Sequence, residues 1–275
     1  MGSNRDTNET LLYLAGILVT FTGLIYLLRT ATPETPPADD HAPGDITGLS
    51  LAKPQWEALF DGCDLKGWAV VERPAKVSVT DSSMVLNMTV YTSRHSFVRT
   101  NEKYKDFIFE VDFKRDSSID SGILFRSENT PDTAFSALFG YMVKIDPSPT
   151  RRWTGGVFLD YGNGLNWLYP LEGDERAQQA EKAGGTWNHL RIEAIGEDIK
   201  VWLNDIPTAH LTDDKYCEGY IAFKIHYLMH DKEQEKLEIA YRNARIITQN
   251  PELYTMPMDL PAKNTKEKLD ITYFR

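Results

Sequence analysis

The chain has 275 residues, of which 41% are hydrophobic and 11% aromatic. This length and composition allow one sizeable hydrophobic core, so we expect one globular domain. The formal net charge of -10 and the lack of any Lys/Arg-rich run exclude the clustered basic surface that a nucleic-acid partner requires.

An apolar segment lies near the amino terminus, where residues 11–28 read LLYLAGILVTFTGLIYLL without a charge. As a helix this segment would be about 27 Å long, which nearly spans the hydrocarbon core of a bilayer. A cleaved signal peptide is the alternative, but Arg5 is the only basic residue before the segment and a small-x-small cleavage site is lacking after it. We therefore predict a tail at 1–10 and a single transmembrane helix at 11–30.

Residues 31–50 form a Pro-rich, acidic segment that predicts an extended tether rather than a packed element. The basic residues on the two sides of the apolar segment, Arg5 and Arg29, barely discriminate between orientations. Because the tether is acidic, we predict that the amino terminus lies inside and the globular domain outside.

Strands dominate the pattern from about Trp56 onward. Residues 107–114 alternate apolar and charged side chains, which is typical of a strand with one face in a core. The same period of two occurs at 189–194, 199–203, 221–226 and 237–242. The sequence therefore predicts an all-β sandwich of two antiparallel sheets over residues 51–248, with one short helix at 174–182.

The sequence contains none of the common nucleophile, phosphate-binding, dinucleotide-binding or zinc-protease motifs. Its two cysteines, Cys63 and Cys217, lack metal-ligand spacing, so we predict neither a metal nor a cofactor. The two thiols could form a disulfide in an oxidising compartment, but we expect them to be free and partly buried.

Five blocks carry a resemblance to a known family. They are LFDGCDLKGW from Leu59, YKDFIFEVDFKRDSSIDSGILFRS from Tyr104, TWNHLRIEAIGEDIKVWLND from Thr186, GYIAFKIH from Gly219 and YRNARI from Tyr241. In this order and spacing they resemble the 3-keto-disaccharide hydrolase family, a concanavalin-A-like jelly roll found in secreted and periplasmic bacterial proteins. The resemblance implies this fold and a periplasmic location at the bacterial inner membrane.

The resemblance also implies a chemistry. A 3-keto group acidifies the neighbouring C2 proton of a glycoside, a base removes that proton, and polar or cationic groups hold the enolate while the C1 substituent leaves. His226 stands at the motif histidine and would be the base, and Arg126 stands at the motif arginine and would orient the sugar or the enolate.

Three positions depart from the family pattern. Met142 and Lys144 replace a glutamate and a glutamine in one strand, and Lys224 replaces a glutamine in another. Two lysines in one groove repel each other unless a carboxylate lies between them, and we expect Asp146 or Asp120 to be that partner. A methionine neither accepts a proton nor binds a hard cation, so these changes favour a degenerate active site.

An aromatic cluster in the loop region would form a wall of the same groove, either to stack on sugar or simply to pack the loop. It consists of Trp153, Tyr161, Trp167 and Tyr169.

The last segment, residues 249–275, lies outside the resemblance and spreads its apolar residues among prolines and charges. It could wrap on the domain or dock on a partner. The candidate partner-binding residues are Tyr254, Met256, Met258, Tyr273 and Phe274.

The helix, tether and carboxy-terminal segment together favour an accessory or scaffold subunit of a bacterial membrane protein complex, with the sandwich as a binding module. A photosynthetic reaction-centre and light-harvesting assembly is one speculative instance. A membrane-tethered 3-keto-glycoside hydrolase or lyase is the first alternative, and a lectin-like glycan-binding module is the second. The sequence does not decide whether the chain is an enzyme, although the substitutions favour a binding role.

Overall fold

The computed structural model describes residues 53–72, 75–88, 94–130, 138–160, 165–226 and 237–266. The predicted amino-terminal tail, transmembrane helix and tether (1–50) lie outside these ranges, as do Tyr161, Tyr273 and Phe274. Within the described ranges, no helix has the length and hydropathy needed to cross a membrane.

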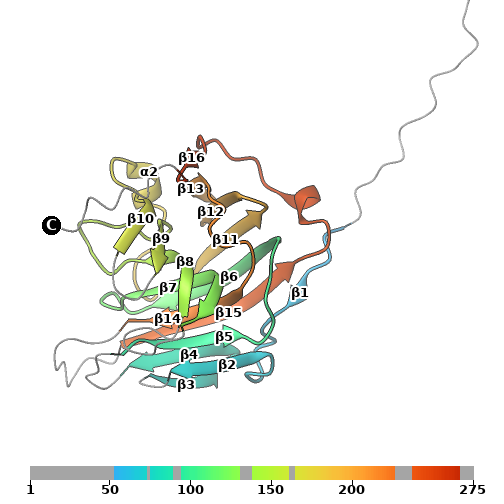
Figure 1. Cartoon of the computed structure of the whole chain (residues 1–275). Helices are drawn as coiled ribbons and strands as arrows, with labels where there is room; N and C mark the ends of the chain where they lie inside the picture. Colours follow the sequence, from blue (N-terminus) through green and yellow to red (C-terminus); the bar gives the residue numbers. More distant parts are fainter. Residues whose placement is uncertain are drawn as a thin grey trace, which may run out of the picture. The chain divides into compact units, whose positions relative to one another are not determined.

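Two sheets pack face to face (Figure 1). The nine-stranded sheet has the order β16 (Lys263–Asn264), β13 (Ile206–Thr212), β12 (Asp198–Leu203), β11 (Asn188–Ile195), β6 (Phe107–Arg115), β15 (Leu237–Ile247), β4 (Ser83–Met88) and β3 (Lys76–Thr80), and β1 (Glu57–Ala58) also pairs with β15. The seven-stranded sheet has the order β10 (Leu165–Tyr169), β9 (Val157–Asp160), β8 (Leu138–Ile145), β7 (Ser121–Asn129), β14 (Tyr220–Ile225), β5 (Ser96–Thr100) and β2 (Trp68–Glu72). The predicted all-β sandwich of two sheets is confirmed.

All five predicted strands form close to their expected bounds, because alternating side chains let one face of each strand enter the core. The short helix predicted within 174–182 also forms, as a single turn, α2 (Glu175–Gln178), which Asp174 caps by accepting a hydrogen bond from the amide of Ala177.

The core between the sheets is rich in aromatic rings. Phe223 stacks on Tyr241 across the sheets, with ring centroids 3.9 Å apart, and Trp68 stacks on the same phenylalanine at 4.9 Å. Trp202 is also buried, whereas Trp187 is half-buried and has the cations of Lys114 and Arg242 at 5.0 and 3.9 Å from its ring. Cys63 and Cys217 are free, but both are exposed rather than partly buried.

The carboxy-terminal segment wraps on its own domain as far as Lys266. It forms a 3-10 turn, η1 (Pro251–Tyr254), and then β16, which pairs with β13 as a parallel strand and so departs from the predicted antiparallel pattern. Tyr254, Met256 and Met258 are half-buried in this wrapped segment. The segment thus wraps on the domain, which was one of its two predicted roles, and the assignment of these residues to a partner-binding surface stays a prediction.

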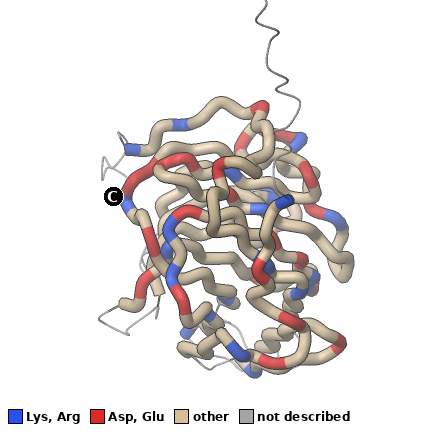
Figure 2. The backbone as a smooth tube through the Cα atoms, turned by 90° about the vertical axis from the view of Figure 1, so that its right-hand side faces the viewer, with Lys and Arg blue, Asp and Glu red and all other residues tan. Residues whose placement is uncertain are grey.

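Acidic and basic residues are interspersed over the described fold (Figure 2).

Candidate functional site

The candidate site lies on the face of the seven-stranded sheet that points away from the core. Strand pairing places Lys224 of β14 opposite Gly122 of β7, and Gly122 opposite Lys144 of β8. A Cβ atom on Gly122 would lie 2.6 Å from Sδ of Met142, so a glycine is needed for this thioether to cross the strand. The predicted placement of Met142, Lys144 and Lys224 together on one face agrees with this register.

Each lysine is buried and paired with a carboxylate. Nζ of Lys144 forms an ion pair with Asp120, and Nζ of Lys224 forms one with Asp160. The two lysines are 3% and 1% exposed, so each charge depends on its partner rather than on water. Burial lowers the pKa of Lys144, and Asp120 opposes this shift.

Asp120 is thus the carboxylate partner expected for Lys144, whereas Asp160 was missed. Asp160 ends a strand in which alternation places it on the same face as Phe158, and this alternation was the available indication.

His226 directly follows β14 beside the first ion pair. Its Nε2 atom lies 3.4 Å from Oδ1 of Asp120, is buried, and has no hydrogen-bond partner among the described residues. Its side chain is 18% exposed. Burial and the charges of Lys224 and Lys144 lower the pKa of His226 well below 6.5, so the imidazole is neutral near pH 7.

A second histidine, His95, packs edge-on against His226 with ring centroids 4.6 Å apart. It is 5% exposed, and its burial together with the charge of Lys224 lowers its pKa to about 3. Sequence reasoning missed this residue, since His95 lies outside the motif blocks and directly before β5.

The charged groups lie in apolar surroundings. The ring of Phe97 lies 5.5 Å from Nζ of Lys224, and the ring of Phe158 lies 5.9 Å from Nζ of Lys144. The buried cluster on this face comprises Phe97, Leu124, Leu138, Met142, Phe158 and Ala222, with Val71 and Trp167 packed against it. Such surroundings strengthen each ion pair and make an unpaired charge costly.

Asp146 belongs to a neighbouring group rather than to the lysines. Although burial raises its pKa, hydrogen bonds from Arg151 and from the amide of Trp153 hold that pKa below its usual range. The Arg151 cation lies 5.4 Å from the ring of Trp153 and 5.8 Å from that of Trp167. These two rings meet edge-on at 4.9 Å, whereas Tyr169 packs against the core between the sheets, so only two of the four predicted wall residues lie together among the described residues.

Arg126 does not join His226. It lies at a register shift in β7 with a positive φ of 47°, about 17 Å along the strand from Ser121. Its guanidinium is buried and donates hydrogen bonds to the backbone carbonyls of Lys105, Gly196 and Tyr216. These contacts fix three loops, and they leave Arg126 far from the expected base.

The described residues contain no group of His, Cys, Asp and Glu side chains arranged to hold a metal ion.

Comparisons with known proteins agree with the fold. The sequence profile of the 3-keto-alpha-glucoside-1,2-lyase-like domain matches residues 55–247. No curated protein sequence matches the chain.

Three solved structures that are similar to this chain share little sequence identity with it. The kappa-carrageenase of Pseudoalteromonas carrageenovora, in complex with an oligotetrasaccharide, has a TM-score of 0.50 at 9% identity over 79% of this chain and 99% of that one. A Bacillus subtilis protein with a galectin-like fold has a TM-score of 0.50 at 14% identity over 70% and 94% of the two chains. A carbohydrate-binding module from Bacillus subtilis has a TM-score of 0.47 at 16% identity over 66% and 95%.

Proposed function

The chain belongs to the family of 3-keto-alpha-glucoside-1,2-lyase-like domains, and we propose that it uses this sandwich as a binding module in which the lyase face is closed. In the same proposal, the apolar segment at residues 11–28 anchors the module in a bacterial inner membrane with the domain on the periplasmic side. The module then serves as an accessory subunit of a membrane protein complex.

The proposal that the lyase face is closed rests on one observation. Phe97, Leu124, Met142 and Phe158 are each at most 1% exposed, and both lysines between them are neutralised by carboxylates of the same chain. A sugar ring needs an open apolar surface and polar groups that are free to bind its hydroxyls. Here the chain's own side chains occupy both roles.

The membrane part of the proposal rests on the sequence of the first 50 residues. In this proposal the partner is contacted through the predicted helix, the tether and the carboxy-terminal segment. No comparison supports a photosynthetic partner, and the proposal names none.

One observation favours a working lyase as the second candidate. Nε2 of His226 is buried without a hydrogen-bond partner among the described residues, which is what a base awaiting a substrate proton requires. His226 would take the C2 proton of a 3-keto-glycoside, and the electron pair would form an enolate beside Lys144. Collapse of the enolate would form the C1=C2 bond and break the C1–O bond, and the proton on His226 would pass to the leaving oxygen. However, the lowered pKa that keeps this imidazole neutral also makes it a weak base.

A turnover assay separates these two functions. The purified full-length protein is incubated with a 3-keto-glucoside, and product is followed by proton NMR beside a His226→Ala variant. We expect no turnover above the level of the variant. Turnover that disappears in His226→Ala, but persists in a His210→Ala control on the other sheet, would establish the lyase and overturn the closed module.

Purification from native membranes tests the membrane assignment. After mild-detergent extraction through a carboxy-terminal tag, we expect the protein in the membrane fraction together with stoichiometric partner subunits. Recovery as a lone protein would contradict the accessory role, and recovery in the aqueous fraction would contradict the anchor.

A further inference from the structure

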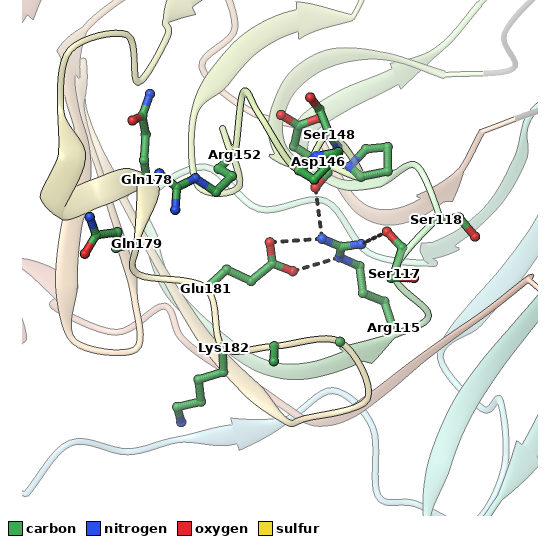
Figure 3. Close-up of a pocket in the computed structure, with 14 residues that line it drawn as sticks. Arg115, Ser117, Ser118, Asp146, Ser148, Arg152, Gln178, Gln179, Glu181 and Lys182 are labelled. Carbon is green, nitrogen blue, oxygen red and sulfur yellow. Dashed lines mark hydrogen bonds and ion pairs between the residues drawn. The ribbon is translucent and has the colours of Figure 1, made fainter.

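Figure 3 shows a pocket of about 630 Å³ whose lining includes neither of the two lysines nor His226. Its walls come from the end of β6, the loop after β8 and the segment after α2. This volume falls within the roughly 300–1,000 Å³ range of small-molecule sites.

The floor of the pocket is an ion pair whose arginine has no N–H group left to bind a ligand. Arg115 donates to both carboxylate oxygens of Glu181, at 2.7 and 3.0 Å, and to the backbone carbonyls of Asp116, Ser117 and Asp146. These contacts use all five N–H groups of the guanidinium. The floor is therefore a rigid support, and the rim must supply the recognition.

The rim carries two cations that lack a carboxylate partner. Arg152 and Lys182 are exposed, and neither forms an ion pair with another side chain in the described ranges. Figure 3 shows Arg152 beside Gln178 and across the pocket from Ser117. Both cations are therefore available to an anionic ligand at this opening.

Neutral hydrogen-bonding groups complete the rim. Gln178 and Gln179 provide amides, and Ser117 and Ser118 provide hydroxyls. Amides and hydroxyls both donate to and accept from sugar hydroxyls, whereas arginine and lysine bind carboxylates or sulfates. A peptide with acidic side chains would use the cations but would leave most of these neutral groups without partners.

We propose that this pocket binds a short stretch of an acidic glycan, with the carboxylates of its sugar units at Arg152 and Lys182 and its hydroxyls at the glutamines and serines. This site is separate from the closed lyase face and does not depend on whether that face is active. It gives the module a ligand class of its own: a carboxylated oligosaccharide of about two sugar units.

Calorimetric titration of the detergent-solubilised full chain tests the site. The probes are digalacturonate, the neutral galactose disaccharide of the same linkage, and a Glu-Glu dipeptide. We expect digalacturonate to bind at least about tenfold more tightly than either control, since charge-assisted hydrogen bonds distinguish it from the neutral sugar. Raising the salt concentration is expected to weaken the binding.

Charge-removing variants locate the site. Arg152→Gln and Lys182→Gln should each weaken digalacturonate binding by about tenfold, while Lys66→Gln, an exposed residue in the loop before β2, should leave it unchanged. Thermal unfolding checks that the variants are folded. Equal loss in all three variants, no binding of digalacturonate, or tighter binding of the dipeptide would each overturn the proposal.

Discussion

The two sheets each bury charged side chains on the face turned away from the core, but they satisfy these charges by different means. On the nine-stranded sheet, Arg191 donates to Oε1 of Glu110 and to Oε1 of Glu193, both at 2.6 Å. Arg245 donates to the second oxygen of Glu110, and the carboxy-terminal segment adds an amide, from Met256, to Glu193. Planar guanidinium groups and backbone groups thus hold this network in one geometry.

On the seven-stranded sheet, the cations are lysines, whose ammonium groups are compact point charges on flexible stems. Each lysine forms an ion pair with a single carboxylate in apolar surroundings. The buried Nε2 atom of His226 has no hydrogen-bond partner among the described residues. On the first face, Oε2 of Glu193 is also buried without a hydrogen-bond partner among the described residues, but Oε1 accepts from Arg191 and Met256. The two faces therefore differ mainly in the kind of cation that they bury.

The largest effect should come from the arginine network. Glu110→Ala leaves Arg191 buried at 7% exposure without one of its two carboxylates, so we expect a loss of about 3–5 kcal/mol in the free energy of unfolding. Urea unfolding measures this loss, with Glu218→Ala in an exposed loop as the control. A loss as small as that of the control would mean that the network adds little to stability.

A smaller effect is expected on the lysine face. Asp160→Asn should cost about 2–4 kcal/mol, less than the arginine network because a buried lysine can release its proton and an arginine does not. Adding Lys224→Met to that variant should recover part of the loss, since a methionine needs no partner in this apolar cluster. If the double variant is less stable than Asp160→Asn alone, Lys224 is held by more than its charge.

The pH dependence of stability should separate the faces further. His95 has a folded pKa of about 3 and an ordinary unfolded value of 6.5, so acidification protonates the unfolded chain first and stability falls as the pH drops from 6.5 toward 3. The slope from this residue is at most about 1.4 kcal/mol per pH unit. Between pH 6.5 and 4.5, the unfolding free energy should therefore fall by about 2 kcal/mol more in the wild type than in His95→Asn.

For His189, on the nine-stranded sheet, the pH dependence of stability should run in the opposite direction. Its hydrogen bond to Asp112 raises its pKa, so its stabilising contribution is full below the unfolded pKa and is lost as the pH rises through the folded one. His189→Asn should therefore lower stability mainly on the acidic side of neutrality. Identical pH profiles for the two histidine variants would remove the electrostatic distinction between the sheets.

The strands and the shared face of Lys144 and Lys224 could be predicted, because a period of two is a local property of the chain. The role of Asp120 could be predicted for the same reason, since this residue directly precedes β7. Asp160 was not, because its ion pair with Lys224 depends on the order β9, β8, β7 and β14, which no local pattern encodes.

At Arg126, a local irregularity makes the prediction from alternating side chains fail. Simple alternation would place it on the outward face with Leu124, but the register shift and positive φ redirect its side chain to three backbone carbonyls. The buried acceptors set this position, and they come from loops distant in sequence. For the carboxy-terminal segment the sequence left wrapping and docking open, because its contacts with Arg191 and Glu193 are all long-range.

The smallest effect tests whether that segment belongs to the arginine network. Met256→Pro removes the amide that donates to Oε1 of Glu193 at 2.8 Å, and the preceding Thr255 already has the extended conformation that a following proline requires. We expect a loss of about 1 kcal/mol in the free energy of unfolding, measured with urea. Met258→Pro is the matched control, because no described group accepts a hydrogen bond from its amide. Equal losses in the two variants would mean that the segment lies on the sandwich without stabilising it, and that the nine-stranded face depends on its side chains alone.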